Sequence, residues 1–479
     1  MIKEKKELNV NKRLRLRRQL AAVPGIAMAA VTLAELILVL ILPSPDSQYV
    51  IYHELFRLGL ILSVAAGAAY FGMIPGGFRR AQAEEDPGTG RIQRMKRRAE
   101  PEDFFFGLFL LWILVSTAYH GLDDKAVYGL PYRYQNVFLT AAYILIYYGV
   151  SRGAGDIGNP ADPADAEAEM KPMRNPRSRP GRRDSRRIAI GLTVCTADLL
   201  AILALAHQFI LPIAAFEAKK GLSATFYNSN HYGYFLTIAV LMSAVQFVAG
   251  QAQRTRSAGM ISFLLNTAVL LLNNTFGCVL SSAVVLVLIT GMIFRRQPDR
   301  KWRATAVLIL FFAIPAAASV MTDGLVENVT TFVEDLGNIF AGSPDAASAG
   351  TNRWGLWITA FQYIREHPIL GFGCEGTAAR MMSEAGVANP HSEVLTYALD
   401  YGIPGAVLYT LGVIAVFLRY IRFGLDRQPE AMMAFAAALG YFISSMFGVA
   451  MFYTTPFLFI LLGYCAGGMK PDPVEKQIR

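Results

Sequence analysis

This sequence of 479 residues is poor in charge and in cysteine. Only 17% of its residues are Asp, Glu, Lys or Arg, whereas 54% are hydrophobic, which is far more apolar than an ordinary soluble domain. The four cysteines, at positions 195, 278, 374 and 465, show no CxxC or other metal-ligand spacing. The composition therefore predicts a chain that lives in a lipid bilayer, with neither a disulfide framework nor a metal site.

Long apolar runs recur along the whole chain. A helix that crosses the hydrocarbon core needs roughly 17–25 predominantly apolar residues. Twelve runs approach this length, at 22–43, 51–74, 104–119, 135–151, 188–213, 231–249, 258–273, 277–294, 304–320, 396–420, 431–449 and 452–468. The sequence predicts an all-α integral membrane protein, a single polytopic domain of about 12 transmembrane helices, with a long and partly helical loop between helices 9 and 10.

Basic residues are nearly absent from every second connection between these runs. If the N-terminus is cytoplasmic, 37 of the 45 Lys and Arg residues lie on its side of the membrane. The eight that remain are Arg57, Lys125, Arg133, Lys219, Lys220, Arg353, Arg365 and Arg380. The positive-inside rule therefore places both termini in the cytoplasm. The net charge of +9 then reflects topology and does not indicate binding to nucleic acid.

The connections differ in length and composition on the two sides. The cytoplasmic loops 75–103 and 152–187 are rich in Pro, Gly and charge and poor in large apolar residues, which is typical of disordered segments at a membrane surface. The outer connections are short except for residues 214–230 and 321–395. We therefore expect the functional groups in these two outer loops.

The long outer loop has helical segments of its own. Trp354, Trp357 and Phe361 recur at helical spacing after Asn352, and the pattern predicts a helix that ends at His367 and Pro368. A second helical stretch is expected over about 375–385, ending near Gly386. A third is expected to begin with Asn389 as N-cap and Pro390 at the first helical position, and to continue into the membrane.

His391 falls in the first turn of that third predicted helix. The positive end of the helix dipole disfavours a charged imidazole there, and a neutral imidazole can act as a general base at neutral pH. The free backbone N–H groups of the same turn would also suit a phosphate. The alternative is an interfacial histidine that is hydrogen-bonded to a loop carbonyl and has a structural role only.

Other polar residues of the two outer loops are candidates for binding a substrate. Arg353 opens the first helix with Trp357 one turn later on the same face, and arginine can grip a phosphate with two N–H groups. Lys219 and Lys220 are further candidates for an anion, the alternative being ordinary solvation. Just after them Asn228 and Asn230, in the stretch YNSNHYGYF, either cap the next helix or direct their amides at a polar substrate.

These residues together resemble a known family. Arg353 and Trp357, then HPILGFG at 367–373, then PHSEVLTYALDYGIPG at 390–405 are similar to the signature of the O-antigen ligase and O-antigen polymerase superfamily of bacterial membrane glycosyltransferases. The stretch YNSNHYGYF resembles that family's Asn-x-Asn segment. The motifs cover roughly residues 214–420, and the layout, with the long outer loop late in the sequence, covers the whole chain.

The resemblance implies a membrane-embedded glycosyltransferase of the GT-C type, which needs neither a metal, a nucleotide sugar nor any other cofactor. His391 would deprotonate the acceptor hydroxyl, and Arg353 would hold the diphosphate of an undecaprenyl-diphosphate-linked glycan donor. Family members carry a second arginine ahead of the Asn pair, where this chain has Lys219 and Lys220. That role is open to the lysines, to Arg380 or to Arg133.

The expected partners are the lipid-linked donor, membrane lipids, and a glycan, lipid or protein that accepts the glycan. The expected location is the bacterial cytoplasmic (inner) membrane, with the active site on its outer face. A polysaccharide transporter or a flippase for lipid-linked oligosaccharides is the alternative, because about twelve helices also suit that class. A transporter is expected to have ionisable groups near helix centres and matching halves, and this chain instead gathers its outer charges in one loop.

Overall fold

The structure is a computed structural model of the chain, which we describe for part of its length. The described residues are 23–34, 53–54, 57–61, 83–85, 92–94, 100–131, 133–155, 185–213, 216, 222–226, 228–319, 324–424 and 429–467. Most of loops 75–103 and 152–187 and both lysines of the first outer loop, Lys219 and Lys220, lie outside these ranges.

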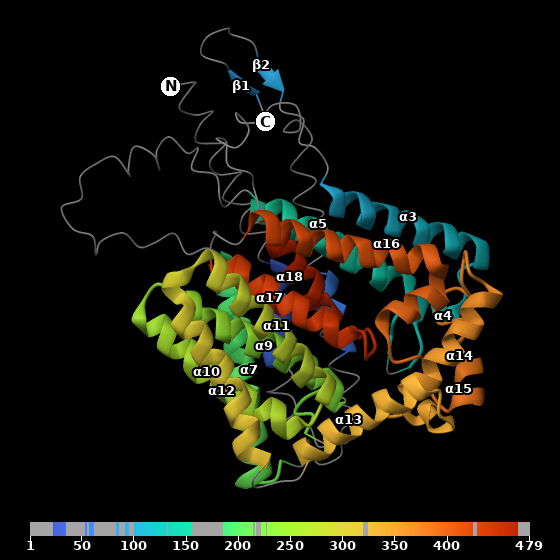
Figure 1. Cartoon of the computed structure of the whole chain (residues 1–479). Coiled ribbons are helices and arrows are strands. Elements are labelled where there is room, and N and C mark those ends of the chain that lie inside the picture. The colour runs from blue at the N-terminus through green and yellow to red at the C-terminus, as the bar shows by residue number, and fades with distance from the viewer. Residues whose placement is uncertain are drawn as a thin grey trace.

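The described part of the chain is helical apart from one short hairpin (Figure 1). The hairpin pairs β1 (Ala83–Glu85) with β2 (Ile92–Arg94) in antiparallel register within the loop that was predicted to be disordered. The helices that occupy apolar runs are α3 (Pro101–His120), α5 (Val137–Gly155), α7 (Ser185–Phe209), α9 (Ser229–Ala249), α10 (Gln253–Asn273), α11 (Phe276–Arg296), α12 (Lys301–Ser319), α16 (Glu393–Phe423), α17 (Pro429–Ser445) and α18 (Thr455–Gly467). Short helices α4 (Asp124–Tyr128) and η1 (Pro298–Arg300) lie in connections.

The protein is a multi-pass membrane protein. Within the described residues, six helices are long and apolar enough to cross a bilayer, namely α3, α7, α9, α10, α11 and α16. Shorter apolar helices occupy Val23–Ala34, Val137–Arg152 and Thr455–Gly467. The last ten predicted runs each coincide with a helix, so these positions are confirmed, while the predicted number of twelve spans is not confirmed.

Helix α9 forms the centre of the bundle. Of its most apolar 18-residue window, 89% is buried inside the protein, because α10, α17, α11 and α7 pack around it. A second group pairs α3 with α16 and α5 with α18, and α17 joins the two groups through α18 (Figure 1). An apolar helix that is buried on all sides needs no polar face, and α9 accordingly carries apolar residues around its whole circumference.

The long outer loop folds into helices α13 (Gly324–Ala341), η2 (Pro344–Ser348), α14 (Arg353–Glu366) and α15 (Ala378–Ala385). Two of these confirm the predicted helices: α14 begins after Asn352 and ends before His367, and α15 ends at Gly386. Helix α13 was not predicted. It is amphipathic: its exposed apolar residues are Val329, Phe332, Val333, Leu336 and Phe340, and its polar residues lie on the opposite face.

Helix α16 is interrupted inside the apolar run. Gly402 has a φ of 74° and breaks the helix two residues before Pro404. The carbonyls of residues 399 and 400 are thereby released from helical bonding and accept hydrogen bonds from the N–H groups of Phe372 (2.8 Å) and Gly373 (3.0 Å). In return, the Ile403 N–H donates to the Pro368 carbonyl at 2.8 Å. The outer loop is therefore hydrogen-bonded directly to α16 at its interruption, over residues 399–403.

Candidate active site

The glycines of the two sequence motifs make this bonding possible. A Cβ on Gly402 would lie 2.0 Å from the Ile369 carbonyl oxygen, and one on Gly371 (φ 70°) would lie 2.5 Å from the Leu399 carbonyl oxygen. Only glycine avoids both the positive φ penalty and these contacts. Helix α3 supports the same junction, since Trp112 Nε1 donates to the Tyr401 carbonyl and Ser116 Oγ donates to the Leu370 carbonyl, each at 2.8 Å.

Arg353 is the first residue of α14. The turn before it holds Asn352 at a φ of 67°, and the Gly350 N–H donates to Asp335 Oδ2 of α13 at 2.8 Å. Arg353 Nη1 donates to the Gly350 carbonyl at 3.0 Å, while its Nε is buried without a hydrogen-bond partner. Among the described residues nothing accepts a hydrogen bond from this N–H, and an unmatched buried donor is costly.

His391 does not lie in the first turn of a helix, and that prediction was wrong. Helix α16 begins at Glu393 with Ser392 as its N-cap. Asn389 instead accepts a hydrogen bond from the His391 N–H at 3.0 Å, which closes an Asx-turn, and His391 itself has a φ of 48°. The asparagine side chain thus stabilises a turn, and the histidine projects from the segment just before the helix.

Trp357 joins the Arg353 helix to this histidine turn. Its Nε1 donates to the carbonyl of Pro390, the residue before His391, at 3.0 Å. Its ring lies 5.8 Å from the Phe447 ring, centroid to centroid, just beyond the end of α17. The predicted arrangement of Arg353 and Trp357 one turn apart is confirmed, and the tryptophan serves as the link between α14 and His391.

The environment of His391 keeps its imidazole neutral. Burial lowers the pKa of His391 to about 4, and the positive charges of Arg353 and Arg133 contribute in the same direction. The predicted cause of a neutral imidazole was the helix dipole. The lowered pKa favours the same neutral form, but its causes are burial first and the two arginines second.

Arg133 reaches this group from the connection between α4 and α5. Its Nη1 donates to Glu375 Oε2 at 2.9 Å, and its Nε and Nη2 are buried with no hydrogen-bond partner in the part of the chain that the structure describes. The pairing of Arg133 with Glu375 was not predicted. Its one signal in the sequence was that Arg133 is among the eight basic residues on the side otherwise poor in them.

The asparagine pair lies at the start of α9. Asn228 is the N-cap, and its Oδ1 accepts from the Asn230 N–H at 2.8 Å, so the capping interpretation is confirmed for Asn228. Both side chains are half-buried. His231, the next residue, is buried, and its Nδ1 is hydrogen-bonded to the Tyr453 hydroxyl. The charge of Arg133 reaches His231 as well as His391.

Arg380 is engaged elsewhere. Its guanidinium, on α15, forms ion pairs with Glu366 at 2.6 Å and Glu384 at 3.0 Å, and its Cζ lies 3.9 Å from the centroid of the Tyr363 ring. The side chain is 43% exposed. Among the interactions of the described residues, none joins Arg380 to Arg353 or His391, so the structure does not bring it into the group.

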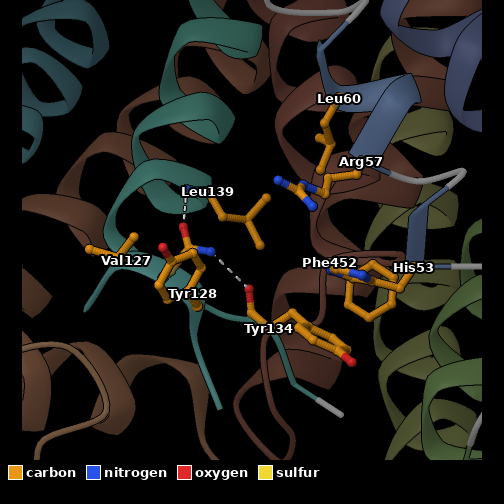
Figure 2. Close-up of a pocket in the computed structure, with 9 residues that line it drawn as sticks. His53, Arg57, Leu60, Val127, Tyr128, Tyr134, Leu139 and Phe452 are labelled. Atoms are coloured by element: carbon orange, nitrogen blue, oxygen red, sulfur yellow. Dashed lines mark hydrogen bonds between the residues drawn. The ribbon is translucent and has the colours of Figure 1, made fainter. Parts of the chain in front are cut away.

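A small cavity of about 90 Å³ is lined by Tyr134, the residue after Arg133, and by Phe452, the residue before Tyr453 (Figure 2). His53 stacks on Tyr134 with ring centroids 3.6 Å apart, and Phe452 packs edge-on to both rings. Arg57, another of the eight basic residues predicted to lie outside, lines the cavity and pairs with Glu54 at 3.3 Å. The cavity contains none of the predicted site residues.

The fold and this site define a class: a multi-pass membrane protein in which loop motifs join the helix of Arg353 to a half-buried histidine whose pKa is lowered. Residues 261–410 match the family model described as O-antigen ligase. This matched stretch is what resembles the O-antigen ligase family, and it contains α11 to α15 and the first part of α16, with Arg353 and His391. No curated protein matches this sequence.

Proposed function

We propose that the protein is a metal-independent glycosyltransferase of the O-antigen ligase or polymerase type. It transfers a glycan from an undecaprenyl-diphosphate-linked donor to the hydroxyl of a glycan, lipid or protein acceptor at the outer face of the bacterial inner membrane. The observation that carries this proposal is a half-buried His391 whose pKa is lowered in part by Arg353, whose own Nε is buried without a hydrogen-bond partner among the described residues. Both residues lie in the stretch that matches the O-antigen ligase model.

His391 acts as the general base in this proposal. Its neutral ring nitrogen accepts the proton of the acceptor hydroxyl as the oxygen attacks the anomeric carbon of the donor sugar. The bond from that carbon to the diphosphate oxygen breaks, and the lipid diphosphate leaves. A donor diphosphate would offset the positive charges that hold the pKa of His391 down, so binding of the donor itself makes the base stronger.

Arg353 stabilises the charge that develops on the leaving diphosphate. Its guanidinium is already anchored through Nη1 to the Gly350 carbonyl, so little side-chain freedom is lost when Nε and the remaining N–H groups meet the phosphate oxygens. Trp357 keeps this arginine helix attached to the histidine turn. Asn228 and Asn230, at the start of α9, are proposed to contact polar groups of the substrate.

Arg133 is the best-supported second cation for the diphosphate. Two of its donor atoms, Nε and Nη2, are buried without a partner among the described residues, and its charge acts on His391. In Arg380, by contrast, Nε donates to Glu384 and Nη1 donates to Glu366. Arg380 is then left with a role at the rim, toward a larger glycan. Lys219 and Lys220 precede the asparagine pair in the chain and are proposed to attract the anionic donor from the outer loop.

Transport remains the alternative class, and it requires ionisable groups along a path through the membrane. One such group is Asp198 in the middle of α7. Its carboxylate accepts hydrogen bonds from Ser262 Oγ (2.5 Å) and Asn266 Nδ2 (2.6 Å) of α10. These contacts hold α7 and α10 together, which gives Asp198 a structural role. Asp198 is therefore no evidence for a transport path, and the enzyme is favoured over the transporter.

The proposal is tested with His391→Ala and Arg353→Ala, assayed with purified protein and an undecaprenyl-diphosphate-linked glycan in the presence of EDTA. Each substitution is expected to abolish transfer without changing the amount of protein in the membrane. Arg365→Ala, on the exposed side of α14, is the matched control and should retain activity. Full transfer by both site variants would refute the assignment, and loss of wild-type transfer only with EDTA would refute metal independence.

A further inference from the structure

The Arg133 and Glu375 pair is unusually deep for an ion pair. The Glu375 side chain is 2% exposed and the Arg133 side chain 11%, with 2.9 Å between Nη1 and Oε2. Burying two charges costs several kcal/mol per ion before their attraction offsets it. A buried ion pair of this kind often adds little to the stability of the fold. The Arg133–Glu375 pair is therefore expected to have a role other than stabilising the protein.

Glu375 is itself held rigidly. Its backbone has a φ of 56°, and its N–H donates to Asp400 Oδ1 at 3.1 Å. Asp400, in turn, lies in the interrupted part of α16, where its carbonyl accepts from Gly373. The residue that binds Arg133 is therefore fixed to the glycine-containing junction between the outer loop and α16. Of the donor atoms of the Arg133 guanidinium, only Nη1 is hydrogen-bonded to Glu375.

We propose that Glu375 is a positioning residue, which fixes Arg133 through Nη1 so that Nε and Nη2 remain directed at the diphosphate of the donor. This inference rests on the proposed function. Glu375 does not contact the substrate. It acts through Arg133, and its negative charge balances the positive charge of the guanidinium when no donor is bound. The other charges that act on Glu375 are those of Lys125 and Asp400.

The charge balance makes the role testable. With both residues present, the carboxylate is compensated by the arginine. If Arg133 alone is replaced, Glu375 stays behind as a buried acid whose negative charge repels the diphosphate. Neutralising Glu375 should therefore have different effects in the two backgrounds: little change when Arg133 is present, and a gain when it is absent. A residue with a merely structural role would have the same effect in both backgrounds.

The experiment is a double-mutant cycle on donor KM and kcat with purified full-length protein. Glu375→Gln keeps an oxygen that accepts from Arg133 Nη1, so its KM should stay within about threefold of wild type, whereas Glu375→Ala should raise KM about tenfold, the equivalent of ~1.4 kcal/mol. Arg133→Met should raise KM by about a hundredfold, and Arg133→Met with Glu375→Gln should recover about tenfold of that loss.

Two results would overturn the proposal. One is an equal loss from Glu375→Gln in both backgrounds, which would mean that Glu375 acts independently of Arg133. The other is unchanged KM for Glu375→Ala. Thermal unfolding of each variant shows whether it is folded, and the cycle can be read from the Gln variants alone if Glu375→Ala does not fold. Activity of His391→Ala would refute the proposed function itself, which separates the two failures.

Discussion

Replacing Arg133 by methionine should move the acid limb of the pH profile to higher pH. Methionine keeps most of the side-chain volume and removes the charge. His391 must be neutral to accept a proton, so activity is lost as the pH falls through its pKa. Because the charge of Arg133 contributes to lowering that pKa, its removal raises the pKa, and protonation then disables the base at a higher pH than in the wild type.

The size of the effect follows from the causes that act on His391. Its pKa falls from 6.5 to about 4, a drop of about 2.5, and burial is the largest cause, Arg353 the second and Arg133 the smallest of the three. The smallest of three contributions cannot exceed one third of their total, so Arg133 accounts for at most about 0.8. Arg133→Met and the double variant Arg133→Met with Glu375→Gln should therefore move the limb by similar amounts, since Glu375 is not among the causes that act on His391.

The measurement is kcat/KM for the donor between pH 4 and 8, since this ratio reports the pKa values of the free enzyme. The wild-type limb should lie well below pH 6.5, and the double variant's limb should lie higher by less than one pH unit. Arg365→Met, on the exposed face of α14, should leave the limb in place. A limb that moves to lower pH, or one that is unchanged in both Arg133 variants, would refute the electrostatic reasoning.

Three further outcomes are expected. Gly402→Ala should destabilise the protein by about 2 kcal/mol or more, since it combines a φ of 74° with a Cβ 2.0 Å from a carbonyl oxygen, whereas Gly291→Ala in α11, with open space around it, should be neutral in a thermal unfolding assay. Val333→Asp, on the apolar face of α13 and 61% exposed, should weaken contact with lipid, seen as reduced quenching of a fluorophore at Leu336 by doxyl lipids, while Thr331→Asp on the polar face should not. A reporter fused after Ala385 should be external and one fused after Arg183 cytoplasmic, and the reverse pattern would invert the predicted topology.

The helices, and the place of Arg353 at the start of α14, could be predicted because their signals are local. Apolar runs mark the spans, and the spacing of Trp354, Trp357 and Phe361 marks α14. The start of α16 was misplaced since Asn389 and Ser392 are both good N-cap residues three positions apart. Only the folded chain shows that the first closes a turn and the second caps the helix.

Other features have no local signal at all. Arg133 and Glu375 are 242 residues apart, so no spacing rule pairs them. The interruption at Gly402 lies inside a continuous apolar run, where a glycine is common in membrane helices and gives no sign of the bonds to residues 368–373. Helix α13 was missed because its polar face lowers the mean hydropathy of the segment. The segment is nonetheless a good amphipathic helix, with apolar residues on the opposite face.

The bonds between α3, the outer loop and α16 have a consequence for biogenesis. Trp112, Ser116 and Arg133 come from the first third of the chain, whereas their partners at 370, 375 and 401 come from the last third. During synthesis, the early helices must wait in the membrane until the late ones are inserted before the site can close. An incompletely made chain therefore carries no reactive centre, and the chain would be active only once its insertion is complete.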